Sequence, residues 1–257
     1  MVSMKKCTVL IPCFNRTNLL KRCIQSFAES FNYVDIIVID DGSEPAISKA
    51  EFGSQSPVSV VRIDKNVGRF SALKFGCAHV ITEYILVFDS DDIWTGDVSV
   101  LRDLESGSYG WVFLTTATKG GSFIASDLYS YFYIRYLSGI RGDLKEICRA
   151  DDFRSATEKI VEVNHCRVPT TLIWLLAFGD NKILFNDQVV CKKYYLAEGM
   201  SRRSLALRIS NAKYMYRLYD LLLRKSRIER VQLSFVWMVA ARRLIYYLVS
   251  KVYDSYH

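Results

Sequence analysis

The chain has 257 residues, half of them apolar, which is enough for one large or two small domains with a packed core. Its net charge of +7 is unevenly distributed. Residues 1–200 carry 22 basic and 24 acidic side chains, whereas residues 201–257 carry 12 and 3. No uninterrupted apolar run reaches the roughly 18 residues of a membrane span. The composition therefore argues against a membrane-spanning helix, and the basic tail predicts an anionic surface near it.

Seven cysteines are present, an odd number, and none forms a CxxC pair. This pattern argues against a thiolate metal site or a disulfide framework, and favours reduced, buried thiols in a cytosolic protein. The first residues, "MVSMKKCTVLIPCF", only superficially resemble a signal peptide. Pro12 and the polar "NRTN" end the apolar run without a cleavage site, so we expect a first strand here.

Four apolar runs rich in Val and Ile occupy 7–13, 34–40, 58–64 and 84–89. They are nearly continuous rather than alternating, which is typical of strands buried on both faces of a parallel sheet. Helical patterns lie between them, clearest at 17–31, where Thr17 or Asn18 is the expected cap, and at 68–82. The order β-α-β-α-β-α-β predicts a three-layer α/β sandwich with a mainly parallel, Rossmann-like sheet and right-handed crossovers.

The second half of the chain gives a coarser prediction. We expect strands at 109–118 and 143–150, a helix at 169–179, a strand or hairpin at 182–195, and a helix or lining segment at 127–139. From Ser201 onward the pattern indicates two amphipathic helices, which form a C-terminal helical extension.

Polar residues follow each of the first four predicted strands, in "PCFNR", "DDGS", "DKNVGR" and "DSDD". Ligands of such sheets bind beyond the carboxyl ends of the strands. Four consecutive polar strand ends therefore predict a ligand site at this edge.

Three carboxylates, Asp89, Asp91 and Asp92, crowd the end of the fourth strand. One interpretation is a polar turn in which Asp91 or Asp92 caps a helix starting near Trp94. The other is a divalent metal site, because Mg²⁺ and Mn²⁺ take one or two carboxylates together with phosphate oxygens of a substrate.

The blocks "TVLIPCFNRTNLLKRCIQSF", "IIVIDDGSEP", "NVGRFSALKFG" and "YILVFDSDDIW" resemble, in order and spacing, those of family 2 glycosyltransferases with the GT-A fold. The segment from 143 to 195 is more loosely similar to the acceptor half of small bacterial members that build O-antigen and other surface polysaccharides. The resemblance implies a nucleotide-sugar-binding half at 1–95, an acceptor-binding half at 96–200, and a basic, aromatic tail at 201–257.

The resemblance also implies residue roles. It assigns Mn²⁺ or Mg²⁺ to Asp91 directly, with Asp89 reaching the ribose or the metal's water shell, and it directs Asp92 towards the sugar or the acceptor as a catalytic residue. The implied nucleotide-sugar-binding residues are Pro12, Phe14, Asn15, Arg16, Asp40, Asp41, Asn66, Gly68, Arg69, Asp89 and Ser90. The implied acceptor-binding residues are Trp94, His165 and Thr170.

An inverting transferase needs a carboxylate that takes the proton of the acceptor hydroxyl. Similar bacterial members carry an acid where this chain has Thr170 and Thr171. Another carboxylate is then required, and Asp152 is the expected catalytic residue; the alternatives are Asp151, Glu158, Glu162 and Asp127. A retaining reaction, in which a leaving phosphate oxygen takes the proton, is the second hypothesis. A non-catalytic sugar-nucleotide-binding protein is the third. A nucleotidyltransferase is disfavoured, because "PCFNRTN" lacks a glycine-rich loop with a lysine.

The tail from Ser201 combines twelve basic residues with nine aromatic ones. Two helices packed on the body, a helix lying on anionic lipid, and a nucleic-acid-binding surface all fit this composition. Because the family's acceptors in polysaccharide assembly are polyprenyl-diphosphate-linked sugars, the resemblance favours lipid over nucleic acid. It implies a cytoplasmic protein, peripheral on the inner face of the bacterial inner membrane.

Overall fold

The computed structural model describes residues 5–53, 56–102, 104, 109–114, 123–125, 144–162, 167–179, 181–193, 209, 211–224 and 233–256. The predicted segment 127–139 and His165 lie outside these residues. The predicted strands 7–13, 34–40, 58–64 and 84–89 are confirmed with small changes at their ends.

An eight-stranded sheet runs through the molecule in the order β3-β2-β1-β4-β8-β6-β9-β7. Its strands are β1 (Cys7–Cys13), β2 (Val34–Asp41), β3 (Val58–Ile63), β4 (Tyr84–Val87), β6 (Tyr109–Leu114), β7 (Phe123–Ala125), β8 (Leu144–Arg149) and β9 (Lys182–Val189). The first four strands are parallel, as predicted. β8 then pairs antiparallel with both β4 and β6, and β9 pairs parallel with β6.

The register of the parallel strands places their carboxyl ends at one edge. Cys13 pairs with Asp40, Asp41 with Ile63, and Leu10 with Val87. Because β8 is antiparallel to β4, it starts at this same edge and ends at the opposite one. The carboxyl edge is therefore where the polar strand ends of the sequence meet.

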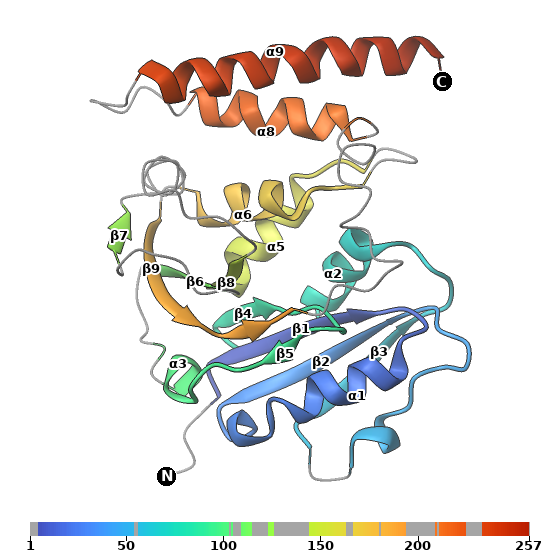
Figure 1. The fold of residues 1–257 in the computed structure, drawn as a ribbon. Coiled ribbons are helices and arrows are strands. Elements are labelled where there is room, and N and C mark those ends of the chain that lie inside the picture. Colours follow the sequence, from blue (N-terminus) through green and yellow to red (C-terminus); the bar gives the residue numbers. More distant parts are fainter. Residues whose placement is uncertain are drawn as a thin grey trace.

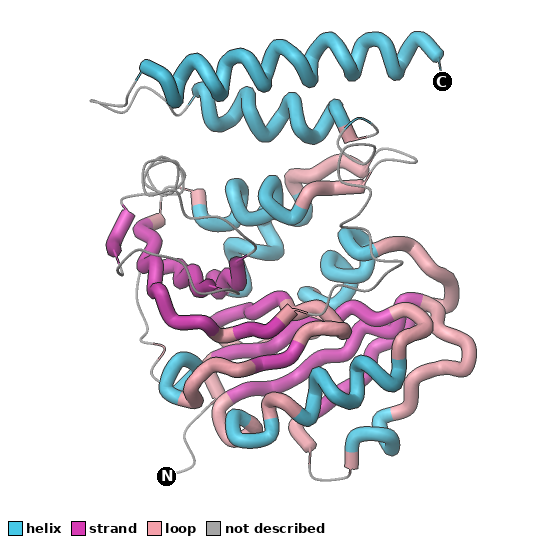
Figure 2. Tube along the Cα trace, in the orientation of Figure 1, coloured by secondary structure: helices cyan, strands magenta, loops and turns pink. Residues whose placement is uncertain are grey.

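Helices cover both faces of the sheet (Figures 1 and 2). They are α1 (Thr17–Gln25), α2 (Arg69–Cys77), α3 (Ser99–Arg102), α5 (Ala150–Glu158), α6 (Thr170–Phe178), α8 (Ala212–Arg224) and α9 (Leu233–Tyr256). Val9 and Ile11 face the core that includes α1, whereas Leu10 faces the core formed with α2, α5 and α6. This alternation explains why the strands have almost no polar residues: both faces are buried.

The connection between β2 and β3 differs from the prediction. It contains only the 3₁₀ turn η2 (Lys49–Phe52), not a helix of a full β-α-β unit. Pro45 and Gly53 bound this short segment, and neither residue supports a longer helix. The first helix ends at Gln25, followed by the 3₁₀ turn η1 (Ala28–Ser30), and no side chain caps its start, so the predicted cap at Thr17 or Asn18 is wrong.

A short antiparallel ribbon lies beside the main sheet, formed by β5 (Ile93–Trp94) and β10 (Cys191–Lys192). The chain after Asp92 therefore enters a strand, so the alternative in which Asp91 or Asp92 caps a helix near Trp94 is wrong. The pairing of Cys191 with Trp94 brings the residues after β10 next to those before β5.

The tail forms the two predicted helices. α8 packs on α6, and α9 packs on α8 at the far side from the sheet (Figure 1). Tyr214, Leu218 and Phe235 join them to the core that covers one face of the sheet. Among the residues that the structure describes, no helix has both the length and the apolar character needed to cross a bilayer.

Gly42, in the turn after β2, packs closely against the loop before α2. A substitution at this position therefore tests the packing of the two loops. Gly42 has a φ of +80°, and a Cβ there would lie 2.7 Å from the backbone nitrogen of Asn66. Gly53 has a similar φ of +84° but no atom within 4 Å of its Cβ position. We expect Gly42→Ala to lower the free energy of unfolding by about 1–2 kcal/mol more than Gly53→Ala.

Urea denaturation of both variants measures this difference. Equal losses of unfolding free energy in the two variants would contradict the prediction. They would mean that the loop before α2 moves away from Gly42 without a free-energy cost, so that only the backbone strain of alanine at a positive φ is measured.

Candidate functional site

The carboxyl edge of the sheet collects polar side chains from six segments. Asp40 and Asp41 end β2, and Asp89, Asp91 and Asp92 follow β4. Asn15 and Arg16 precede α1, whereas Arg69 begins α2. Lys145 comes from the start of β8, and Lys193 directly follows β10. The sequence prediction of a ligand site at this edge rests on the first four strand ends; the two lysines were not predicted.

The two aspartates of β2 hold the neighbouring loops. Both oxygens of Asp41 accept backbone hydrogen bonds, from Val67 at 2.8 Å and from Gly68 at 3.0 Å. Burial raises the pKa of Asp41 despite these bonds. Its carboxylate therefore fixes the loop that leads to α2.

Asp40 is fully buried and holds the turn that follows β2. It accepts hydrogen bonds from the backbone of Ser43 at 2.8 Å and Ile47 at 3.1 Å, and it is ion-paired with Arg62. Burial alone would raise its pKa, but the hydrogen bonds lower it below the usual value. A carboxylate with no exposed surface and this many partners does not fit the predicted contact with the nucleotide; it supports the turn instead.

Asn15 joins the ends of β1 and β2. Its side-chain oxygen accepts a hydrogen bond from the backbone of Glu44 at 2.8 Å, and its own backbone donates to Ser43 Oγ at 3.0 Å. Its φ of +52° is a left-handed conformation that asparagine tolerates well. Phe14 beside it is exposed, which is unusual for a large apolar side chain at a polar edge and fits a surface for a flat ligand.

Asp89 is surrounded by cations. Its Oδ1 accepts hydrogen bonds from Arg69 Nη2 at 2.6 Å and Nε at 3.2 Å. Its Oδ2 lies 3.6 Å from Lys145 Nζ and 3.8 Å from Lys193 Nζ. Burial alone would raise the pKa of Asp89, but attraction to these three cations lowers it far below the usual value. Asp89 therefore stays ionised and already has a positive partner at each oxygen.

Asp92 and Lys145 form a buried ion pair. Lys145 Nζ lies 2.8 Å from Asp92 Oδ2 and 4.4 Å from the ring centroid of Phe88. Burial opposes the charge of Lys145, but Asp89 and Asp92 overcome it and raise its pKa. Asp92 is 1% exposed, so its predicted contact with the sugar or the acceptor does not fit the structure. Its physical role is to hold Lys145.

Asp91 is less exposed than Asp89, with side chains 20% and 28% accessible, but among the described residues it has a single ion-pair partner. Its Oδ2 accepts a hydrogen bond from Arg16 Nη1 at 3.0 Å. Burial is the main cause that raises the pKa of Asp91, and the negative charge of Asp89 raises it further. No group of three or more His, Cys, Asp or Glu side chains in the described part of the chain has the geometry of a metal cage. Asp91 alone still fits the pattern of Mg²⁺ or Mn²⁺ sites in which one carboxylate and substrate phosphates share the ion.

Two other predicted site residues lie away from this edge. Asp152 is in the first turn of α5, just after β8, and accepts a hydrogen bond from Asn181 at 3.2 Å. Because Arg149 pairs with Tyr84, this turn lies at the amino end of β4, one strand length from Asp89. Trp94 is buried, with its ring stacked on Phe27 at 5.1 Å. The predicted catalytic role of Asp152 and acceptor contact of Trp94 are therefore not supported by their positions.

Thr170 lies towards the carboxyl edge of the sheet, where the other predicted site residues gather. α6 ends shortly before Lys182, which starts β9 at the amino edge, so Thr170 at the other end of α6 lies towards the carboxyl edge (Figure 1). The remaining predicted residues are placed at the edge as follows: Pro12 is half-buried in β1, Ser90 is buried after β4, and Asn66 is exposed in the loop before Gly68. Gly68 has a φ of +88° and is the residue before α2.

The structure brings one further acid to this edge, Glu146. Lys145 and Ile147 face the core that includes Phe88, so the alternation of β8 directs Glu146 to the other face, on which α6 packs. There it acts electrostatically on Arg69. No sequence signal identified it, because its position depends on the pairing of β8 with β4.

Glu162, one of the predicted alternatives, accepts a hydrogen bond from Ser71 in α2 at 2.5 Å.

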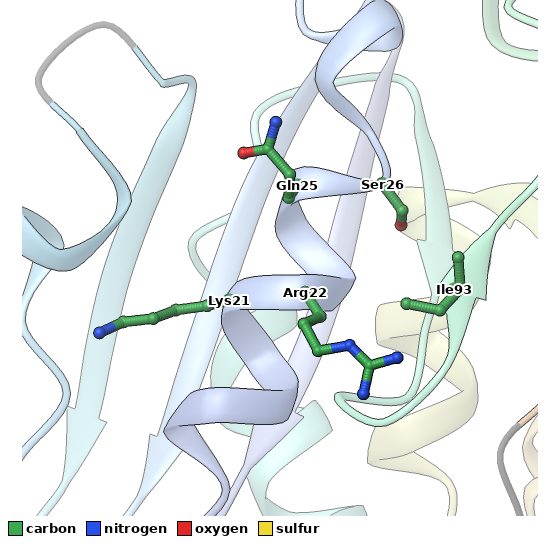
Figure 3. Close-up of a pocket in the computed structure, with 5 residues that line it drawn as sticks. All are labelled: Lys21, Arg22, Gln25, Ser26 and Ile93. Atoms are coloured by element: carbon green, nitrogen blue, oxygen red, sulfur yellow. The ribbon is translucent and has the colours of Figure 1, made fainter.

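A shallow hollow of about 530 Å³ lies between α1 and β5 (Figure 3). Its lining residues are Lys21, Arg22, Gln25, Ser26 and Ile93. Ile93 directly follows Asp92, so the hollow lies beside the charged cluster and not over it. None of the residues predicted for the site lines this hollow. The candidate site is therefore identified by the polar groups that converge at the carboxyl edge and not by this hollow.

The buried pair of Lys145 and Asp92 gives a direct test of this geometry. Removing one partner leaves a buried charge, which typically costs about 3–5 kcal/mol. We expect Lys145→Met to lower the free energy of unfolding by about this amount, and the double variant Lys145→Met/Asp92→Asn to recover part of it. Chemical denaturation of the two single variants and the double variant gives the coupling energy, and strictly additive losses would contradict the ion pair.

Residues 8–106 match the family model described as glycosyl transferase family 2. Two curated relatives match about a third of this chain. The undecaprenyl-phosphate 4-deoxy-4-formamido-L-arabinose transferase of Klebsiella pneumoniae is 32% identical over 95 residues, and glycosyltransferase GlyA of Streptococcus pneumoniae is 29% identical over 90. Each match covers 34% of this chain but only 29% and 13%, respectively, of those relatives.

Solved structures extend the likeness to the whole fold. TarS residues 1–349 of S. aureus match 93% of this chain and 70% of that structure, with a TM-score of 0.63 and 13% identity. The mannosyltransferase PcManGT of Pyrobaculum calidifontis, solved with GDP-Man and Mn²⁺, matches 94% of this chain and 70% of that one, with a TM-score of 0.58 and 14% identity. Residues 8–106 are thus similar to glycosyl transferase family 2 sequences, and the chain shares its overall fold, the predicted GT-A fold, with these solved structures.

Proposed function

We propose that this chain transfers a sugar from a nucleotide diphospho-sugar to a lipid-linked oligosaccharide acceptor during surface-polysaccharide assembly, such as that of O-antigen. The observation that carries the proposal is the convergence at one sheet edge of Arg16, Arg69 and Asp91, beside the exposed ring of Phe14. Support for the donor class comes from TarS, solved with UDP-GlcNAc, and from PcManGT, solved with GDP-Man. The Klebsiella relative is named as an undecaprenyl-phosphate transferase, which supports a polyprenyl acceptor.

The donor side follows from the chemistry of the leaving group. A nucleoside diphosphate departs with additional negative charge, and the guanidinium groups of Arg16 and Arg69 are suited to bind phosphate oxygens. The backbone loop held by Asp41 brings Gly68 close to the same place, where the missing side chain lets a ligand approach. Asp91 would hold Mn²⁺ or Mg²⁺, which, when bound, supplies positive charge to the leaving diphosphate.

The acceptor side lacks an acid at Thr170, and Glu146 is the carboxylate that we propose in its place. It faces α6 at the carboxyl edge and is near Arg69 in electrostatic terms, whereas Asp152 lies at the opposite edge. With Glu146 taking the proton from the acceptor hydroxyl, the reaction inverts the anomeric configuration. A retaining reaction would need no such base.

Nucleotide release tests the activity and the base together. Incubation with UDP-, GDP-, CDP- and dTDP-sugars and Mn²⁺ is expected to release a nucleoside diphosphate from one of them. Glu146→Gln should lower transfer about 100-fold or more without weakening donor binding, because general-base catalysis typically contributes that much. Glu162→Gln removes another carboxylate, which follows α5 and accepts a hydrogen bond from Ser71; it is the matched control and should retain most activity.

Absence of turnover with every donor, in the presence of a polyprenyl-linked acceptor, would favour a non-catalytic sugar-nucleotide-binding protein. A product with the donor's anomeric configuration, determined by NMR, would refute inversion and the role of Glu146.

The outer face of α9 is suited to an anionic membrane surface. Trp237, Leu244 and Leu248 share one side of the helix and are each more than half exposed, with Ile245 beside them. Lys213, Arg224, Arg242 and Lys251 are exposed on α8 and α9. Among the described side chains of these two helices the single acid is Asp220, which is paired with Arg224 and Arg243. We propose that this face lies on anionic lipid at the cytoplasmic side of the inner membrane and brings the site to its acceptor.

Vesicle sedimentation tests this surface. The chain should sediment with vesicles containing phosphatidylglycerol at low salt and dissociate at high salt. Trp237→Ser/Leu248→Ser should weaken the binding about tenfold or more by removing apolar area, whereas Val161→Ser, an exposed apolar residue outside α8 and α9, should not. A wild-type chain that stays in solution with these vesicles would contradict the proposal.

A further inference from the structure

The three aspartates at the end of β4 and the basic side chains paired with them carry more positive than negative charge. Asp89, Asp91 and Asp92 meet Arg16, Arg69, Lys145 and Lys193 within ion-pair distance, which leaves a net charge of +1 on these seven side chains. A site that depends entirely on a divalent cation to attract a diphosphate would be expected to have uncompensated carboxylates. Here the carboxylates are already compensated.

Lys145 and Lys193 reach the cluster from segments far along the chain. Lys145 is at the start of β8, which pairs antiparallel with β4, and its ammonium lies under the cluster against the Phe88 ring. Lys193 follows the ribbon of β5 and β10, in which Lys192 pairs with Ile93, so Lys193 lies opposite Asp92. Its Nζ is 3.8 Å from Asp89 Oδ2 and 3.9 Å from Asp92 Oδ2.

The two lysines differ in what they can contact. The side chain of Lys145 is 5% exposed, so it can act on a ligand only through the aspartates that it holds. The side chain of Lys193 is 18% exposed, and its distances to both carboxylates are longer than a hydrogen bond. Lys193 therefore lies at the accessible side of the cluster, where its positive charge can act on an anionic ligand.

We propose that Lys193 binds the diphosphate of the donor together with Arg16 and Arg69, and that Lys145 is a positioning residue that keeps Asp89 and Asp92 as its counter-ions. The fixed charge of the chain then binds a nucleoside diphosphate without a divalent cation. Asp91 would hold the ion, which would supply positive charge for the transfer step. This inference rests on the proposed function, because it specifies how the same donor site binds its ligand.

Isothermal titration calorimetry of the full chain with UDP, GDP, CDP and dTDP, each with EDTA and with Mn²⁺, tests the proposal. The wild-type chain should bind one of them in EDTA. Lys193→Met should weaken that binding about tenfold or more, since a charge-assisted hydrogen bond to phosphate contributes this much. Lys192→Met removes the same charge from the neighbouring exposed position of β10 and should leave binding nearly unchanged.

Lys145 needs a readout that a purely structural role would not change. Lys145→Arg keeps the positive charge, so it should retain binding in EDTA, whereas Lys145→Met should weaken binding in EDTA more than binding with Mn²⁺. Lys145→Met/Asp92→Asn restores the net charge of +1 on the remaining side chains, so it should fold and recover binding in EDTA.

The outcomes separate the inference from the proposed function. Binding that requires Mn²⁺ in the wild-type chain, or EDTA binding that Lys193→Met leaves intact, would overturn the inference and leave the transferase proposal in place. If none of the four nucleotides binds under either condition, the proposed function fails and the inference fails with it.

Discussion

The ammonium group of Lys145, held between Asp89 and Asp92, is the interaction on which the architecture of this edge depends. Four strands from distant parts of the sequence surround it: the acids follow β4, β8 supplies the lysine, and the ribbon of β5 and β10 closes the other side with Lys193. A buried charge without its partners is costly, so the arrangement is strongly specified once the sheet has formed. Phe88 and the protonated thiol of Cys191, whose pKa burial raises to about 12, complete the surroundings.

The fold of the first half was predictable because its signals are local. Continuous Val and Ile runs separated by polar loops identify parallel strands, and parallel strands put their carboxyl ends together without any knowledge of side-chain contacts. The same reasoning placed Asp91, Arg16 and Arg69 at one edge. It did not reveal that Asp40 would be fully buried behind Arg62, since that depends on the fold of the turn after β2.

In the second half of the chain, the positions of the site residues depend on strand pairing that the sequence does not reveal. Closeness in sequence to the segment that lacks an acid at Thr170 favours Asp152 as the base. The antiparallel course of β8 separates the two, since Asp152 follows the end of that strand while Glu146 is near its start. Lys145 and Lys193 likewise have no local pattern that distinguishes them from solvated lysines. Their importance arises from pairings across more than fifty residues, and the order of strands in the sheet is needed to see them.

The ribbon of β5 and β10 limits which segments of this chain can be exchanged with a related protein in a chimera. The segment that matches the family model ends at residue 106, yet two of the four cations in the cluster come from residues 145 and 193. A chimera that exchanges only the matched segment with a relative would combine aspartates from one protein with counter-charges from another. The smallest exchangeable unit of this site is therefore a set of paired strands and not a continuous stretch of chain.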